Sequence, residues 1–285
     1  MTAKLATLLV SCTDKKGIVA SLAQVLYGHG ANILDADQHT DPIAGMFFQR
    51  IRFDLASLTT DRVALELGIT ECAARFQMAF SLSYASHVRR VAVFVSKQEH
   101  CLYDLLVRHK AGELACEVAV IVSNHEAAAP IATYFGIPFH HLPVTPETKV
   151  AQEAKIVELL ERERVDLIVL ARYMQVLSPE LVARYPSRVI NIHHSFLPAF
   201  VGASPYRQAY ERGVKLIGAT SHYVTAELDQ GPIIEQATIP CSHKDSVEDL
   251  VRVGRDLEKR VLAAAVRWHL EDRVLVYAGK TVVFD

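Results

Sequence analysis

Between residues 89 and 171 the sequence alternates short, almost wholly apolar runs with amphipathic stretches. Unbroken apolar runs are typical of strands buried on both faces, and helical periodicity between them is typical of crossovers in a parallel sheet. The alternation therefore predicts an open α/β sheet with helices on both faces. The expected strands are 89–95, 118–123, 139–142 and 165–171, and the expected helices are 100–113, 127–136 and 150–163.

The first 85 residues follow a different pattern. Apolar runs and alternating stretches predict strands at 4–10, 32–39, 46–55 and 78–84 and helices at 18–27 and 58–76. The order β-α-β-β-α-β is that of a ferredoxin-like unit. The pattern changes near residues 86–88 without a linker rich in Gly, Pro or Ser. We therefore expect one domain over 1–85 and a second over 86–285.

Composition excludes several classes of protein. Apolar residues make up 51% of the chain, which is enough to form a core, and a net charge of -2 disfavours a nucleic-acid binder. The five cysteines are scattered without a C-x-x-C pair, which disfavours disulfide frameworks and thiolate zinc sites. The N-terminal apolar run is short and charge follows it directly, so we expect no signal peptide, no membrane span and a cytoplasmic protein.

Polar residues gather where the apolar strands end, which is where open α/β sheets bind ligands. The turn Ser96–Cys101 contains no glycine, which disfavours a phosphate-binding loop. The segment Asn191–Pro198 is the most polar strand end of the chain. In an extended segment Asn191 and His193 share one side. An amide and an imidazole directed at one point suit polarisation of a carbonyl and stabilisation of an oxyanion.

Further candidates follow along the chain. His222 lies in the next predicted strand, 216–224, and Asp229 precedes a Gly-Pro turn, where a carboxylate can orient an imidazole or activate water. Structural roles stay open for both residues, and for His194, because capped histidines and turn aspartates are common. Adjacent histidines in a strand point to opposite faces, so the pairs 193–194 and 140–141 do not predict a metal site. Cys101 lacks an activating neighbour and is expected to be inert.

Segment 191–234 resembles the folate-dependent formyltransferases. It contains Asn-x-His-x-Ser-x-Leu-Pro, then Gly-x-Thr-x-His-x-Val, then Asp-x-Gly-Pro, in that order. The resemblance implies a catalytic set of Asn191, His193 and Asp229, with His222 beside it. The run LARYMQVL at 170–177 resembles the family's pterin-binding loop. It implies a folate pocket lined by Met174, Gln175, Val176 and Leu177.

The N-terminal part resembles an ACT domain. The match is Asp14-x-x-Gly-Ile-Val followed by Gly30-x-Asn-Ile. ACT domains commonly bind amino acids at subunit interfaces and pair into oligomers. The resemblance therefore implies an amino-acid effector and a homo-oligomer, and it leaves the identity of the effector and the number of subunits open.

An ACT domain followed by a Rossmann-like sheet of the formyltransferase type resembles the formyltetrahydrofolate deformylases. The turn Ser96–Cys101 replaces the glycine-rich phosphate turn of the glycinamide ribonucleotide transferases, and His194 stands where those enzymes usually have proline. The resemblance implies hydrolysis of 10-formyltetrahydrofolate to tetrahydrofolate and formate, which supplies purine synthesis and balances one-carbon pools. It implies no metal and no cofactor beyond the folate substrate. The alternatives are a formyltransferase with an amine acceptor and an inactive folate sensor. The division of proton transfers between His193 and Asp229 is open.

Overall fold

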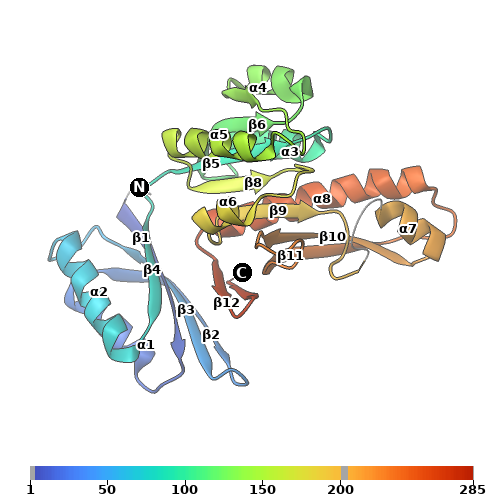
Figure 1. Ribbon diagram of the computed structural model, residues 1–285. Helices are drawn as coiled ribbons and strands as arrows, with labels where there is room; N and C mark the ends of the chain where they lie inside the picture. Colours follow the sequence, from blue (N-terminus) through green and yellow to red (C-terminus); the bar gives the residue numbers. More distant parts are fainter. Residues whose placement is uncertain (1–3, 200–204, 285) are drawn as a thin grey trace. The chain divides into compact units, whose positions relative to one another are not determined.

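The computed structural model describes residues 4–199 and 205–284 (Figure 1). Its internal contacts separate two compact units. The first holds the described residues up to Val88 together with 272–277 and 282–284, and the second holds the described residues of 89–271 with 278–281. The chain thus leaves the first unit near residue 88 and returns to it close to the C-terminus. The division into 1–85 and 86–285 does not include this return.

The first unit is an antiparallel sheet with the strand order β2-β3-β1-β4 and two helices. This confirms the ferredoxin-like order. Its elements are β1 (Leu5–Thr13), α1 (Ile18–Gly28), β2 (Asn32–Asp41), β3 (Met46–Asp54), α2 (Arg62–Phe76) and β4 (Ala79–Tyr84).

Helix α2 begins later than residue 58, where the apolar pattern placed its start. The Asp61 carboxylate accepts a hydrogen bond from the Ala64 backbone amide at 2.8 Å, which is the arrangement of an N-cap. Apolar periodicity alone does not locate this boundary because Leu58 also packs against the core. The capping aspartate sets the start at Arg62.

Both faces of the first sheet are covered. On one face Leu8 of β1 packs with Leu22 of α1 and Ile69 of α2. Because side chains alternate along a strand, Leu9 points to the other face, where it joins a cluster with Phe48 and Phe284. This second cluster explains why the C-terminal residues belong to the first unit.

The second unit is built on a seven-stranded sheet with the order β11-β10-β9-β8-β5-β6-β7. Strands β5 to β9 pair in parallel with one another, whereas β10 pairs antiparallel with β9 and β11 pairs antiparallel with β10 at one edge. This confirms the predicted open α/β sheet. Its strands are β5 (Arg89–Val95), β6 (Cys116–Ser123), β7 (Phe139–His141), β8 (Leu167–Leu170), β9 (Val189–His193), β10 (Leu216–Tyr223) and β11 (Ile233–Pro240).

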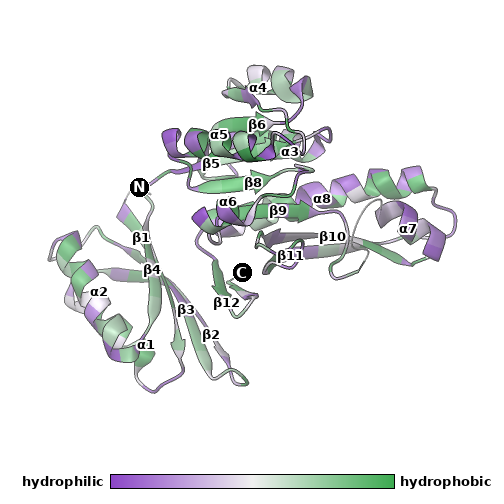
Figure 2. Ribbon diagram, viewed as in Figure 1, coloured by the Kyte–Doolittle hydropathy of each residue, from purple (hydrophilic) through white to green (hydrophobic). Residues whose placement is uncertain are grey.

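Helices cover both faces of this sheet (Figure 1). Every residue of 91–95 in the central strand β5 is therefore buried. Figure 2 shows the central strands in the colour of apolar residues. The helical elements are α3 (His100–Lys110), η2 (Glu126–Ala128), α4 (Ala129–Phe135), α5 (Lys149–Arg162), α6 (Pro179–Arg184), α7 (Pro205–Arg212) and α8 (Val247–Leu270). A hairpin of β12 (Val274–Tyr277) and β13 (Lys280–Val283) follows. Over the described ranges, no helix combines the length and apolar character that crossing a membrane requires.

Helix α8 has 24 residues and was not assigned from the sequence. It starts with a capping box in which Ser246 and Asp249 bond each other's backbone amides. The helix contacts β9, β10, β11 and α3, and it therefore lies along the strands whose ends carry the polar residues. It contributes a buried carboxylate, Glu258, to the same region.

Candidate active site

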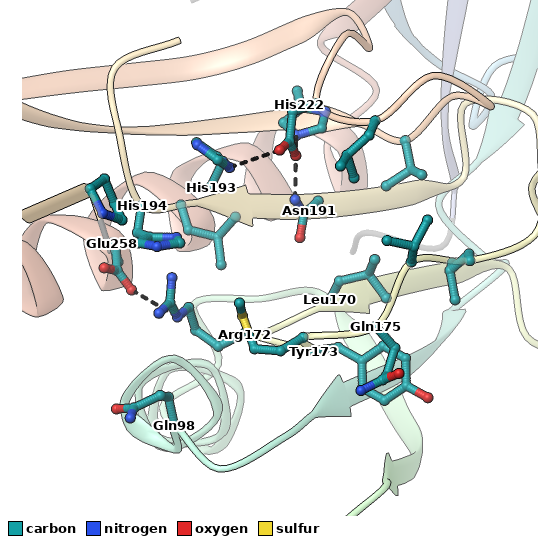
Figure 3. Close-up of a pocket in the computed structure, with 18 of the residues that line it drawn as sticks. Gln98, Leu170, Arg172, Tyr173, Gln175, Asn191, His193, His194, His222 and Glu258 are labelled. Atoms are coloured by element: carbon teal, nitrogen blue, oxygen red, sulfur yellow. Dashed lines mark hydrogen bonds and ion pairs between the residues drawn. The ribbon is translucent and has the colours of Figure 1, made fainter. Parts of the chain in front are cut away.

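A cavity of about 730 Å³ lies at the carboxyl ends of β8 and β9, and every residue that lines it belongs to the second unit. Figure 3 shows its polar centre. The lining comes from the loop after β8, the end of β9, the loop after β10 and helix α8. It includes each of the eight site residues expected from the sequence: Asn191, His193, His222, Asp229, Met174, Gln175, Val176 and Leu177.

The pairing of two strands brings two of these side chains together. In the antiparallel pair β9 and β10, His222 lies directly opposite Asn191. Side chains at directly opposed positions lie on the same face and within reach of each other. The Asn191 Nδ2 atom is 3.3 Å from His222 Nε2.

Asp229 completes the group from the loop after β10. Its backbone is left-handed, with a φ of 55°, and its side chain is 13% exposed. One carboxylate oxygen lies 3.2 Å from His193 Nδ1 and the other 3.6 Å from His222 Nε2. The hydrogen bond from His193, and then that from His222, outweigh burial and hold the pKa of Asp229 well below its ordinary value. Asp229 is therefore a carboxylate at neutral pH.

The remaining ring contacts indicate which nitrogens carry protons. His222 Nδ1 lies 2.9 Å from the Tyr223 carbonyl oxygen, so this nitrogen donates. His222 Nε2 faces both the Asn191 amide and the Asp229 carboxylate, so it accepts from Asn191 when the ring is neutral and donates to Asp229 when the ring carries a second proton. In either case at least one Asn191 N–H is left for a ligand. His193 lines the cavity, and its buried Nε2 has no hydrogen-bond partner within the part of the chain that the structure describes. This nitrogen keeps a hydrogen-bonding capacity that no described residue uses.

Gly231 lets the Asp229 loop approach β10. A Cβ at this position would overlap the Tyr223 carbonyl oxygen and lie 3.2 Å from His222 Nδ1. We expect Gly231→Ala to lower the melting temperature by at least about 5 °C, because backbone atoms must move to relieve the overlap. Thermal unfolding followed by circular dichroism measures this. Gly28→Ala is the matched control, since a Cβ there meets nothing within 4 Å. Equal melting temperatures for the two variants would contradict the account.

The part of the cavity beside the loop after β8 has an apolar wall. Met174, Val176 and Leu228 line it and are 56%, 54% and 60% exposed. Large apolar side chains exposed inside a cavity indicate a ligand with an apolar surface. Gln175 is partly buried, whereas Leu177 is 7% exposed and also packs into the core beneath the sheet. The amide of Met174 donates to Ser96 Oγ at 3.0 Å, which fixes the start of this loop.

Other candidates from the sequence lie elsewhere or are inactive. His140 and His141 are on β7, where His141 Nδ1 lies 3.3 Å from Glu126, and neither lines the cavity. Burial, and then the charge of Arg172, lower the pKa of His194 to about 3, so His194 is neutral. Burial raises the pKa of the Cys101 thiol well above its ordinary value, which keeps it protonated.

Sequence reasoning missed a buried polar cluster in the same cavity. Glu258 is 1% exposed, accepts from Tyr206 at 2.6 Å, and lies 2.8 Å from His100 Nε2 and 3.5 Å from Arg172 Nε. A glutamate on the apolar face of an amphipathic helix was the available signal. One donor atom each of His100, Cys101 and Glu258 lie within 4.8 Å of one another, but a cation there would meet the positive charge of Arg172.

The comparisons with known proteins agree with this geometry. The family described as formyl transferase matches residues 89–266, and the ACT domain matches residues 6–64. Formyltetrahydrofolate deformylase of Bacillus subtilis is 52% identical over 279 residues, covering 98% of this chain and 93% of that protein. The chain belongs to the formyltetrahydrofolate deformylases. The deformylase of Escherichia coli K12 is 41% identical and covers 95% of both chains.

Solved structures separate the deformylases from the transferases. A formyltetrahydrofolate deformylase from Pseudomonas syringae has a TM-score of 0.96 at 46% identity and covers 99% of this chain and 95% of its own. A glycinamide ribonucleotide transformylase from Symbiobacterium toebii has a TM-score of 0.67 at 34% identity. It covers 72% of this chain and 98% of its own. The similarity to the deformylase therefore extends over both parts of this chain.

Proposed function

We propose that this chain hydrolyses 10-formyltetrahydrofolate to tetrahydrofolate and formate. The observation that supports this best is the convergence of Asn191, His193 and Asp229 on one cavity, with the Asp229 carboxylate between two imidazoles. A carboxylate, an unpaired imidazole nitrogen and an amide donor are the groups that attack of water on an amide requires. Membership of the deformylase family supports the same reaction.

Water is activated by Asp229 in this proposal. The carboxylate binds a water molecule and accepts its proton, directly or through His193, while the oxygen attacks the formyl carbon. The negative charge that develops on the formyl oxygen is stabilised by the free N–H of Asn191 and by Nε2–H of protonated His193. Collapse of the tetrahedral intermediate breaks the bond to N10, and His193 returns the proton to N10. His222 holds the Asn191 amide in position through the 3.3 Å contact.

The substrate's pterin ring lies against the loop 173–177 in this proposal, with Met174 and Val176 on its face and Gln175 and Leu177 beside it. The exposed apolar side chains of this loop support that placement. No metal or additional cofactor takes part, because the carboxylate and the imidazole suffice to activate water and the Arg172 charge opposes a cation near Glu258.

The wider roles extend the same proposal. The ACT domain binds an amino acid that regulates the enzyme, and the protein assembles as a homo-oligomer through these domains in the cytoplasm. The ACT match and the ferredoxin-like sheet support regulation and pairing. The formate released supplies purine synthesis and balances one-carbon pools.

The pH dependence follows from the Asp229 environment. Its pKa in the folded state lies below the value of about 4 expected in the unfolded chain. The carboxylate therefore stays ionised as the pH falls past about 4 and is protonated only in stronger acid. We expect Asp229→Asn to cause a large loss of the hydrolysis rate at about pH 5.5 as well as at about pH 8, because Asp229 is ionised at both pH values. Initial rates at the two pH values measure this. A loss confined to the higher pH would contradict an ionised Asp229.

The proposal is tested by following 10-formyltetrahydrofolate spectroscopically in buffer without any amine, for the wild type and for His193→Ala. We expect steady turnover by the wild type and a loss of about 10²-fold or more in the variant, the usual contribution of a general acid–base. Turnover only after an amine acceptor is added would show a transferase, the alternative that the comparisons do not favour.

A further inference from the structure

The end of the cavity beside Glu258 is not used by the proposed hydrolysis of 10-formyltetrahydrofolate. Figure 3 shows Tyr173 and Gln175 on one side of Asn191, and Gln98 and Glu258 on the other side. This end is lined by Gln98, Tyr206, Arg207, Arg255 and Glu258. A formyltransferase needs such a space for the body of its amine acceptor, whereas a hydrolase needs room only for water.

Arg172 extends into this end from the loop after β8. Its backbone is left-handed, with a φ of 64°, a conformation that side chains other than glycine disfavour. Its side chain is 12% exposed, and Nε lies 3.5 Å from Glu258. Its Nε and Nη1 atoms are buried without a hydrogen-bond partner among the described residues. Strain and unsatisfied donors at one residue are typical of a functional position.

Glu258 is held firmly enough to anchor Arg172. Its two oxygens bond Tyr206 at 2.6 Å and His100 at 2.8 Å, and burial leaves it 1% exposed. Gly254, one turn earlier on α8, admits Tyr206, because a Cβ there would overlap the Tyr206 ring and hydroxyl. Buried ion pairs contribute little to stability compared with apolar packing. The buried cluster around Glu258 is therefore better explained by a role in function than by a contribution to stability.

Arg172 shares the cavity with the proposed reacting groups. Arg172, His193 and His194 all line the same cavity. The His194 ring is 5.3 Å from the ring of His193, centroid to centroid. Arg172 thus borders the catalytic residues on the side of Glu258.

We propose that Arg172, positioned by Glu258, occupies the space through which an amine acceptor would reach the formyl carbon, and so restricts the nucleophile to water. This inference rests on the proposed hydrolysis. Transfer would form a bond from the amine nitrogen to the formyl carbon and break the bond to N10, while the amine loses one proton and N10 gains one. That chemistry needs only the groups already present and a place for the amine.

The test compares product ratios in the full-length protein. Wild type and Arg172→Gly are incubated with 10-formyltetrahydrofolate carrying a ¹³C formyl group and with glycinamide, and formate and formylglycinamide are measured by NMR. Glycine suits the left-handed backbone and opens the space. We expect formate alone from the wild type, and a ratio of formylglycinamide to formate at least about tenfold higher from Arg172→Gly. A ratio that stays at the wild-type value while hydrolysis continues would overturn the proposal.

Two further variants separate this role from general damage. Arg207→Ala removes the same charge from an exposed position on the same cavity and is expected to yield formate only, whatever its rate. Arg172→Asn also shortens the side chain, in a residue that tolerates the left-handed backbone, and it is expected to raise the ratio if Arg172→Gly does not melt cooperatively. A ratio is independent of the fraction of active enzyme. If the wild type releases no formate without glycinamide, the proposed function fails, and this failure is distinct from an unchanged ratio.

Discussion

Asp229→Asn is expected to reduce kcat for hydrolysis of 10-formyltetrahydrofolate by about 10³-fold or more. The substitution preserves size but removes the charge that the rings of His193 and His222 face at 3.2 and 3.6 Å. Water then loses its proton acceptor, and protonated His193 loses the charge that stabilises it. Steady-state rates with saturating substrate measure the effect.

Asp256→Asn is the matched control for this variant. Asp256 is an exposed carboxylate on α8, and its side chain is 71% exposed beside Lys259. Surface pairs of this kind contribute little, so we expect the wild-type rate and melting temperature. If Asp229→Asn retained more than about a tenth of the wild-type kcat, the carboxylate would not be the base, since removing a general base costs more than this.

Asn191→Ala is expected to reduce kcat by about 10²- to 10³-fold with little change in the affinity for tetrahydrofolate. The amide contacts His222 at 3.3 Å and supplies a donor to the formyl oxygen only as negative charge develops. An interaction made only in the transition state lowers kcat and kcat/KM together. Single-turnover kinetics and tetrahydrofolate binding by fluorescence titration measure the two quantities.

Asn191→Asp is a second substitution that tests the role of the Asn191 amide as a donor. It keeps the shape but replaces the donor with an acceptor near Asp229, so we expect a loss at least as large as that of Asn191→Ala. A variant at this position that weakened tetrahydrofolate binding as much as it lowered kcat would show a role in substrate binding instead of oxyanion stabilisation. The double variant with Asp229→Asn is expected to lose less than the product of the two single losses, because the residues act as a unit.

Local sequence patterns predict much of this fold because they report local physics. The buried run at 91–95 identifies a strand covered on both faces, and alternation places Asn191 and His193 on a common side. The cluster of Leu9, Phe48 and Phe284 was not predicted. It joins residues far apart in the sequence, and no periodicity reports such a contact.

The residues of the site could be predicted from the sequence, but the contacts between them could not. The residue types at the strand ends and the family resemblance point to Asn191, His193, His222 and Asp229, and the structure brings these four side chains to one cavity. The contact of Asp229 with both rings depends on a left-handed turn and on the close approach of Gly231. Arg172 was passed over because its importance lies in a buried partner on a distant helix.

In the proposed reaction water alone accepts the formyl group. The most direct test of this reaction measures both products, tetrahydrofolate and formate, from one sample of wild-type enzyme in buffer free of amines. We expect one formate for each tetrahydrofolate, formed at a constant rate until the 10-formyltetrahydrofolate is consumed. A rate without amine that does not exceed the enzyme-free rate, restored by an added amine acceptor, would contradict it.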